Sequence, residues 1–97
     1  MFLGEKIFKA VKVVSGRRRD RFDVIANILG VAQDRVKKYE LRSQCFMSSR
    51  QLEGYLDLIL RAKLITVEND GSSLIFRVSR KGEEFLTAYE RLQILLK

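Results

Sequence analysis

The sequence predicts a single, mainly α domain of the α+β class, in which several short helices accompany one β-hairpin. Three observations predict it. The chain has 97 residues, the size of one domain. Apolar residues recur at helical spacing through most of its length. Two β-rich runs, at 64–68 and 74–78, flank a turn-forming segment. We therefore expect one domain over residues 1–97.

The first expected element is an amphipathic helix at 3–14, within an N-terminal portion that covers residues 1–16. Its apolar positions follow one another at steps of four, four and three; they are Leu3, Ile7, Val11 and Val14. A strand is the weaker alternative for residues 11–14, where valine and lysine alternate. The run Arg17, Arg18 and Arg19 follows, and it indicates either a solvated linker or a contact with phosphate groups.

Three helices are expected next, at residues 20–30, 34–44 and 48–63. Each begins at a residue whose side chain can cap a helix; these are Asp20, Asp34 and either Ser48 or Ser49. The third helix separates two faces at 100° per residue. Its apolar sector holds Leu52, Leu56, Ile59, Leu60 and Lys63. Its opposite sector holds Arg50, Gln51, Gly54, Leu58 and Arg61.

The hairpin completes a core over residues 20–79, and Ser79 caps a last helix over residues 80–97. The order of elements is helix, helix, turn, helix and hairpin, which is typical of a winged helix-turn-helix. In that fold the third helix keeps one polar face that the major groove of DNA can accept.

Several segments resemble an archaeal winged-helix family that includes the ten-kilodalton type-a chromatin protein of Sulfolobus. They are residues 22–29, Met47-Ser48, Tyr55-Leu56, Leu60, Leu64-Ile65 and residues 78–86, which contain a Lys-Gly step. The resemblance implies binding of double-stranded DNA, often by dimers joined through the C-terminal helix. This chain has Phe46 where the family often has Asn. It has Lys63 where the family often has Gly, so the third helix lacks its usual left-handed stop.

Candidate DNA-binding residues are basic, polar or small, and they are Arg17, Arg18, Arg19, Arg35, Lys37, Lys38, Arg42, Ser48, Ser49, Arg50, Gln51, Gly54, Tyr55 and Arg77. Arg50 and Gln51 can contact base edges, and Gly54 permits close backbone approach. An exposed helix face is the alternative. Tyr55 fits a phosphate contact and the core edge equally. Because the hairpin tip is acidic, we expect this wing to add little affinity.

The first and last helices carry more apolar surface than a three-helix core absorbs, which indicates a partner surface. We expect a homodimer, whose interface candidates are Leu3, Ile7, Val11, Phe85, Tyr89, Leu92 and Leu96. Packing of the two helices on each other within one monomer is the alternative.

The composition excludes several functions. The chain has no His and one Cys, which excludes a zinc site and His-based catalysis. No phosphate-binding glycine motif is present, so we expect no cofactor, no small-molecule substrate and no enzyme activity. We expect no membrane-spanning segment and a cytoplasmic, nucleoid-associated location. Peripheral membrane attachment of residues 1–21 is a minor alternative.

The net charge is +7, and all of it is held by residues 1–50. This basic half favours nucleic acid as the partner. We expect a transcription regulator or chromatin-organising protein. A winged-helix protein-interaction module is the alternative, because a fold does not determine a function.

Overall fold

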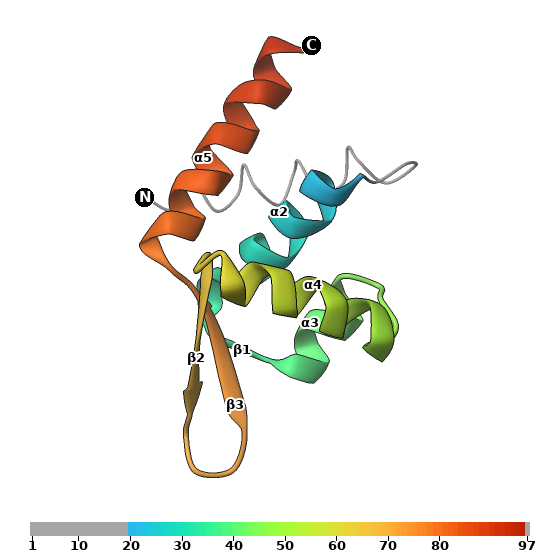
Figure 1. Ribbon diagram of the computed structural model, residues 1–97, viewed down its shortest axis with the longest axis vertical. Helices are drawn as coiled ribbons and strands as arrows, with labels where there is room; N and C mark the ends of the chain where they lie inside the picture. The colour runs from blue at the N-terminus through green and yellow to red at the C-terminus, as the bar shows by residue number, and fades with distance from the viewer. Residues whose placement is uncertain (1–19, 97) are drawn as a thin grey trace.

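The computed structural model describes residues 20–96, so the helix expected at 3–14 lies outside the described residues. The elements in chain order are α2 (Arg21–Val31), the 3₁₀ turn η1 (Ala32–Asp34), β1 (Val36–Lys37), α3 (Lys38–Gln44), α4 (Ser49–Arg61), β2 (Ile65–Asn69), β3 (Leu74–Val78) and α5 (Arg80–Leu95). Figure 1 shows α5 at one end of the molecule and the β2–β3 hairpin at the other, with α2, α3 and α4 between them. The predicted α+β fold class is confirmed.

Three helices begin at the residues that the sequence predicts. The Asp23 amide donates to the Asp20 carboxylate at 2.9 Å, and the Asp23 carboxylate accepts from the Asp20 amide in return. Ser48 and Gln51 form the same reciprocal pair at the start of α4. Ser79 caps α5. Side-chain caps satisfy amide groups that have no partner inside the helix, so the starting residue is specified locally.

The second helix begins at Lys38, and the prediction of a start at Asp34 is wrong. Asp34 ends the 3₁₀ turn η1, and the backbone then extends into β1. Val36 pairs with Phe76 of β3 in antiparallel register and is buried. Burial of the valine and pairing with β3 therefore outweigh the capping preference of the aspartate.

The sheet has three antiparallel strands in the order β1-β3-β2. Strands β2 and β3 form the predicted hairpin, with Ile65 opposite Val78 and Asn69 opposite Leu74. Strand β2 lies one residue later than the sequence predicts. The central strand β3 buries Ile75, Phe76 and Val78, and through them the sheet joins the helical core.

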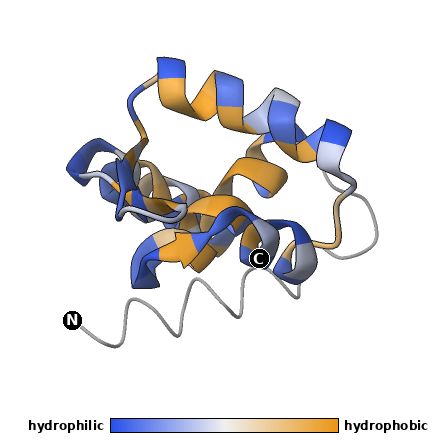
Figure 2. Ribbon diagram, turned by 90° about the horizontal axis from the view of Figure 1, so that it is seen from below, coloured by the Kyte–Doolittle hydropathy of each residue, from blue (hydrophilic) through white to orange (hydrophobic). Residues whose placement is uncertain are grey.

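The core lies where α2, α3, α4 and α5 meet. Its fully buried side chains come from all four of these helices; the largest are Ile28, Leu29, Leu41, Leu52, Ile59 and Leu86. Each contributes about 1.5–3 kcal/mol through burial. Cys45, which follows α3, is also fully buried. Figure 2 shows the hydrophobic positions of the helices turned toward this interior.

The end of α4 departs from the expected pattern. Lys63 adopts the left-handed conformation with φ 64°, so the stop that was expected to be missing is present without glycine. The Lys63 carbonyl accepts a 2.7 Å hydrogen bond from the Ser79 hydroxyl, which joins this turn to the start of α5. Gly82 lies against the same turn, and a Cβ there would lie 2.6 Å from Val78 Cγ2. The Lys-Gly step therefore allows α5 to pack closely on the turn after α4.

Candidate nucleic-acid interface

Helix α4 presents a polar, exposed face over a buried apolar one. Leu52 and Ile59 are fully buried. Arg50, Gln51 and Gly54 are exposed on the opposite side, where the sequence places them. A Cβ added at Gly54 would have no neighbour within 4 Å, so this part of the helix surface is open. The arrangement presents the Arg50 guanidinium, the NH2 group of Gln51, whose amide oxygen accepts from the Ser48 amide at 3.1 Å, and the bare backbone of Gly54.

A shallow groove separates α3 from α4 beside this face. Its lining includes Lys38, Tyr39, Arg42, Ser49 and Glu53. The Arg42 guanidinium donates to the Ser49 hydroxyl at 3.4 Å, so both of these candidates lie at the same point. Arg42 and Ser49 can both donate hydrogen bonds to a phosphate oxygen.

Glu53 forms an ion pair with Lys38 across this groove. Lys38 is a DNA-binding candidate from the sequence, whereas the sequence indicates no role for Glu53. The two residues are 15 positions apart on different helices, and no local pattern indicates their contact. Tyr39 also lines this groove and is 62% exposed, although the sequence indicates no function for it. The charge of Lys38 is therefore offset before any ligand binds.

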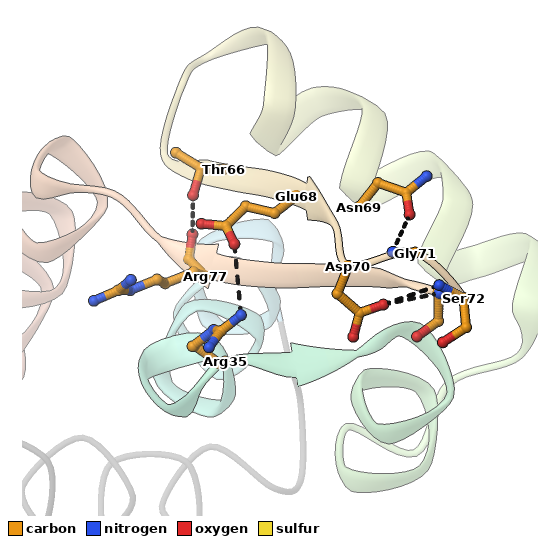
Figure 3. Close-up of polar contacts among 9 residues, drawn as sticks. Arg35, Thr66, Glu68, Asn69, Asp70, Gly71, Ser72 and Arg77 are labelled. Atoms are coloured by element: carbon orange, nitrogen blue, oxygen red, sulfur yellow. Dashed lines mark hydrogen bonds and ion pairs between the residues drawn. The ribbon is translucent and has the colours of Figure 1, made fainter.

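The wing has its own polar contacts, drawn in Figure 3. The Arg35 guanidinium lies 3.5 Å from the Glu68 carboxylate and links the start of β1 to β2. The Thr66 hydroxyl donates to the Arg77 backbone carbonyl at 3.2 Å, and the Arg77 side chain is exposed on β3. Among the described residues, the Arg77 side chain makes no ion pair. It remains the basic group that the wing can present.

Asp70 organises the wing loop. Its carboxylate accepts hydrogen bonds from the amides of Ser73 and Ser72 at 3.1 and 3.2 Å. These two bonds, followed by the positive charges of Lys37 and Arg35, lower the pKa of the Asp70 carboxyl below its ordinary value. The pairing with Arg35 thus offsets the charge of Glu68, whereas Asp70 keeps its negative charge within the loop.

The structure also places the remaining candidates within residues 20–96. Ser48 caps α4, and Tyr55 is half-buried against the core, which is the alternative that the sequence left open for it. Lys37 lies on β1 beside the wing, where it and Arg35 act on the charge of Asp70. The run Arg17, Arg18 and Arg19 lies outside the described residues. The described candidates therefore form two groups, one at the α3–α4 junction and one at the β1–β3 edge.

The net positive charge is concentrated in a shorter segment than residues 1–50. Residues 20–96 hold twelve basic and eleven acidic side chains, a net of +1. Residues 1–19 hold six basic and one acidic side chain, a net of +5, and Lys97 adds one more. The basic groups among the candidates are therefore local features of a nearly neutral body.

The interface candidates on α5 divide into two pairs. Tyr89 is buried in the monomer and its hydroxyl donates to the Asp23 carboxylate of α2. The Phe85 ring lies between Phe22 and Tyr89, at centroid distances of 6.4 and 6.5 Å. Leu92 and Leu96 are 58% and 84% exposed. The remaining candidates, Leu3, Ile7 and Val11, lie outside the described residues.

Comparisons with known proteins agree with this architecture. A family model described as winged helix-turn-helix matches residues 18–97. MepR of Staphylococcus aureus, a transcription regulator of the multidrug efflux pump MepA, is 12% identical over 98% of this chain and 77% of its own, with a TM-score of 0.62. RV1404 of Mycobacterium tuberculosis is 13% identical over 93% of this chain and 65% of its own, with a TM-score of 0.59.

A weaker structural match covers 20% of human N-acetylserotonin methyltransferase at 19% identity, with a TM-score of 0.48. The sequence matches none of the curated proteins with which it was compared. Within residues 20–96, no helix is long and apolar enough to cross a membrane.

Proposed function

The chain belongs to the winged helix-turn-helix family, and we propose that it is a non-enzymatic protein that binds double-stranded DNA. The observation that carries this proposal is the outward face of α4. In this family of folds the corresponding helix enters the major groove with its N-terminal residues toward the bases. Arg50 and Gln51 stand in the first turn of α4 and are exposed, and Gly54 leaves room for close approach.

The surrounding groups supply contacts to the DNA backbone. Arg42 and Ser49 lie together beside α4, in position to hold a phosphate on one side of the groove. Lys37 and Arg77 offer charges at the β1–β3 edge for the opposite strand. The run at residues 17–19 adds three guanidinium groups just before α2. Backbone contacts set the affinity and the register, whereas α4 supplies sequence preference.

We further propose that the protein is a cytoplasmic transcription regulator or a nucleoid-associated chromatin protein that acts as a homodimer. The exposed apolar end of α5 supports the dimer, because Ile94 and Leu95 are uncovered in the monomer. A two-fold dimer presents two copies of α4, and it then binds half-sites about one helical turn of DNA apart. The resemblance to the archaeal family supports the chromatin role.

A salt-series titration with specific and random duplexes tests DNA binding. Each phosphate contact contributes about −0.9 to the slope of log affinity against log salt. Arg18→Ala should weaken binding to all sequences equally and reduce the slope by about 0.9. Arg50→Ala should cost about 1–3 kcal/mol on the preferred sequence and flatten the preference. The matched control is Arg91→Ala, an exposed arginine on α5 far along the chain from α4, which should change neither.

One result would contradict the proposal, and another would restrict it to the chromatin role. Affinity that stays constant between low and moderate salt excludes binding through phosphate contacts. Equal losses on all sequences from Arg50→Ala and Arg18→Ala exclude base reading by α4 and leave a nonspecific chromatin role.

A protein-interaction module is the second candidate, and the near-neutral body favours it. Residues 20–96 carry a net charge of +1, and Leu58 is 39% exposed on the same outward side of α4. A nearly neutral surface with an exposed leucine is better suited to a protein partner than a strongly basic surface is. Fluorescence anisotropy with the full chain and a labelled duplex at low salt discriminates the two, because an interaction module leaves the duplex unbound.

A further inference from the structure

An apolar groove runs between the start of α2 and the second half of α5. Phe22 and Phe85 form one end of its lining, and Leu92 and Leu96 continue it along α5. Phe22 and Leu92 are each 58% exposed, although both face a shared depression rather than scattered sites on the surface. Apolar surface gathered in this way is unfavourable in water and marks a contact.

We propose that residues 3–14 of the same chain form a helix that fills this groove. The segment carries one apolar stripe, made of Leu3, Ile7, Val11 and Val14. The groove offers an apolar wall from the single stripe of α5 that contains Phe85, Leu92 and Leu96. Two helices with matching stripes bury them against each other, which is the way amphipathic helices gain most of their stability.

The two stripes have the same length. From Leu3 to Val14 there are eleven residue steps, which span about 17 Å in a helix. From Phe85 to Leu96 there are also eleven steps, and the α5 wall is therefore about 17 Å long. A helix at 3–14 would cover the whole groove without leaving part of either stripe exposed.

The position of the segment along the chain favours its own groove over that of a second copy. Residues 15–19 connect it to Asp20, and Asp20 itself lines the groove. The six steps from Val14 to Asp20 reach at most about 20–22 Å, so the segment cannot move far from this site. A short tether of this kind keeps the segment at an effective concentration in the millimolar range.

The charges are complementary as well. Asp20 and Asp23 stand at the α2 side of the groove, and both contribute to its lining. Lys6 borders the apolar stripe of the segment, whereas Lys9 and Lys12 lie on its opposite side. Lys6 can therefore meet the acidic margin of the groove while the stripe covers its apolar wall. The same placement would hold the three arginines at 17–19 beside the first turn of α2.

Disulfide trapping in the full chain tests the proposal. In a Cys45→Ala background, Leu92→Cys is combined with either Ile7→Cys or Val11→Cys. Counted along matched stripes, Ile7 faces Leu92 if the helices are antiparallel, and Val11 faces it if they are parallel. Lys9→Cys with Leu92→Cys is the control, because Lys9 lies opposite the stripe. We expect one stripe pair to form an intramolecular disulfide at least about tenfold faster than the control, as its Cα atoms come within bonding range.

Mixing two singly substituted chains identifies the occupant. If the chain carrying Val11→Cys or Ile7→Cys joins the chain carrying Leu92→Cys, the groove holds a second copy and the proposal is overturned. It is also overturned if neither stripe pair reacts faster than the Lys9 control.

A double-mutant cycle provides an independent measurement without cysteines. Leu92 is more than half exposed within residues 20–96, so Leu92→Ala leaves the described core intact. With the segment docked, Leu92→Ala and Ile7→Ala should each reduce the folding constant about tenfold, by removing buried leucine or isoleucine surface. The double variant should reduce the folding constant by much less than the product of the two single reductions, because both substitutions remove the same contact. Fully multiplicative losses would show that the two side chains do not meet.

Discussion

Gly54→Ala separates the stability of α4 from its role in binding. Gly54 lies in the interior of this helix, and a Cβ there would meet no atom within 4 Å. Alanine in a helix interior is about 0.5–1 kcal/mol more favourable than glycine, since glycine loses more conformational freedom on folding. The substitution should therefore raise the melting temperature by about 2–8 °C in a domain of this size.

The same methyl group should weaken DNA binding. If α4 lies in the major groove with Gly54 toward the DNA, the space that is open in the free protein is filled in the complex. Overpacking of a close interface costs about 1–3 kcal/mol, which corresponds to about a 5- to 150-fold loss of affinity. Circular dichroism melting and fluorescence anisotropy at a fixed salt concentration measure the two effects on the same preparation.

Gly82→Ala is the internal control for the stability measurement. There a Cβ would lie 2.6 Å from Val78 Cγ2 and against the Leu64 backbone, so the melting temperature should fall. A Gly54→Ala variant with a higher melting temperature and unchanged affinity would refute close approach of DNA to α4. A lower melting temperature would refute the open helix surface on which the reasoning rests.

Three further outcomes are expected. Phe46→Asn should stabilise the protein by about 1 kcal/mol in denaturant unfolding, because Phe46 is 81% exposed at φ 55° and Asn tolerates that conformation; Phe46→Ala, which keeps the strain, should not. Glu53→Gln should strengthen duplex binding at low salt by releasing Lys38 and removing a negative charge; an unchanged affinity places this groove away from phosphate. The pKa of Asp70 is lowered from its ordinary value of 3.8. The hydrogen bonds of its carboxylate in the wing loop are therefore fully present at any pH above 3.8, and they are lost as the pH falls through the folded-state pKa. The amide signal of Ser73 should therefore shift at acid pH, and Asp70→Ala should abolish that titration.

Features set by neighbouring residues were predictable from the sequence. The caps at Asp20, Ser48 and Ser79 depend on contacts three residues away, and the hairpin depends on a turn between two β-rich runs. The outward face of α4 followed from helical periodicity alone. These features carry most of the fold and the central part of the candidate site.

Features set by distant residues were not predictable. Strand β1 exists because Val36 pairs with Phe76, forty positions later in the chain. The contact between Tyr89 and Asp23 joins residues 66 positions apart and turns Tyr89 from an interface candidate into a core residue. The pairing of Lys38 with Glu53 likewise required the packing of α3 on α4. Single-sequence periodicity shows which face of a helix is apolar, but it does not show which partner covers that face.

At Lys63 the preference of glycine for the left-handed conformation is outweighed by the contacts of the surrounding residues. Lys63 lacks the freedom of glycine, yet its amide and that of Leu64 donate to the carbonyls of Leu60 and Ile59 at 3.0 Å. Leu64 is also buried. These contacts offset a strain of about 1–2 kcal/mol at one residue. The structural requirement at this position is therefore a conformation, and glycine is only the least strained residue that meets it.

The distribution of charge assigns different tasks to the two parts of the chain. The body of residues 20–96 has a net charge of +1, so its contribution to DNA binding must come from the placement of a few groups rather than from its overall field. Residues 1–19 hold a net of +5 and contain the arginine run. Phosphate contacts act on all sequences, whereas base contacts act on one. A segment held in the α2–α5 groove would thus supply salt-dependent affinity from one side of the body, while α4 supplies sequence preference from another. The two quantities should respond to different substitutions, because they originate in different parts of the fold.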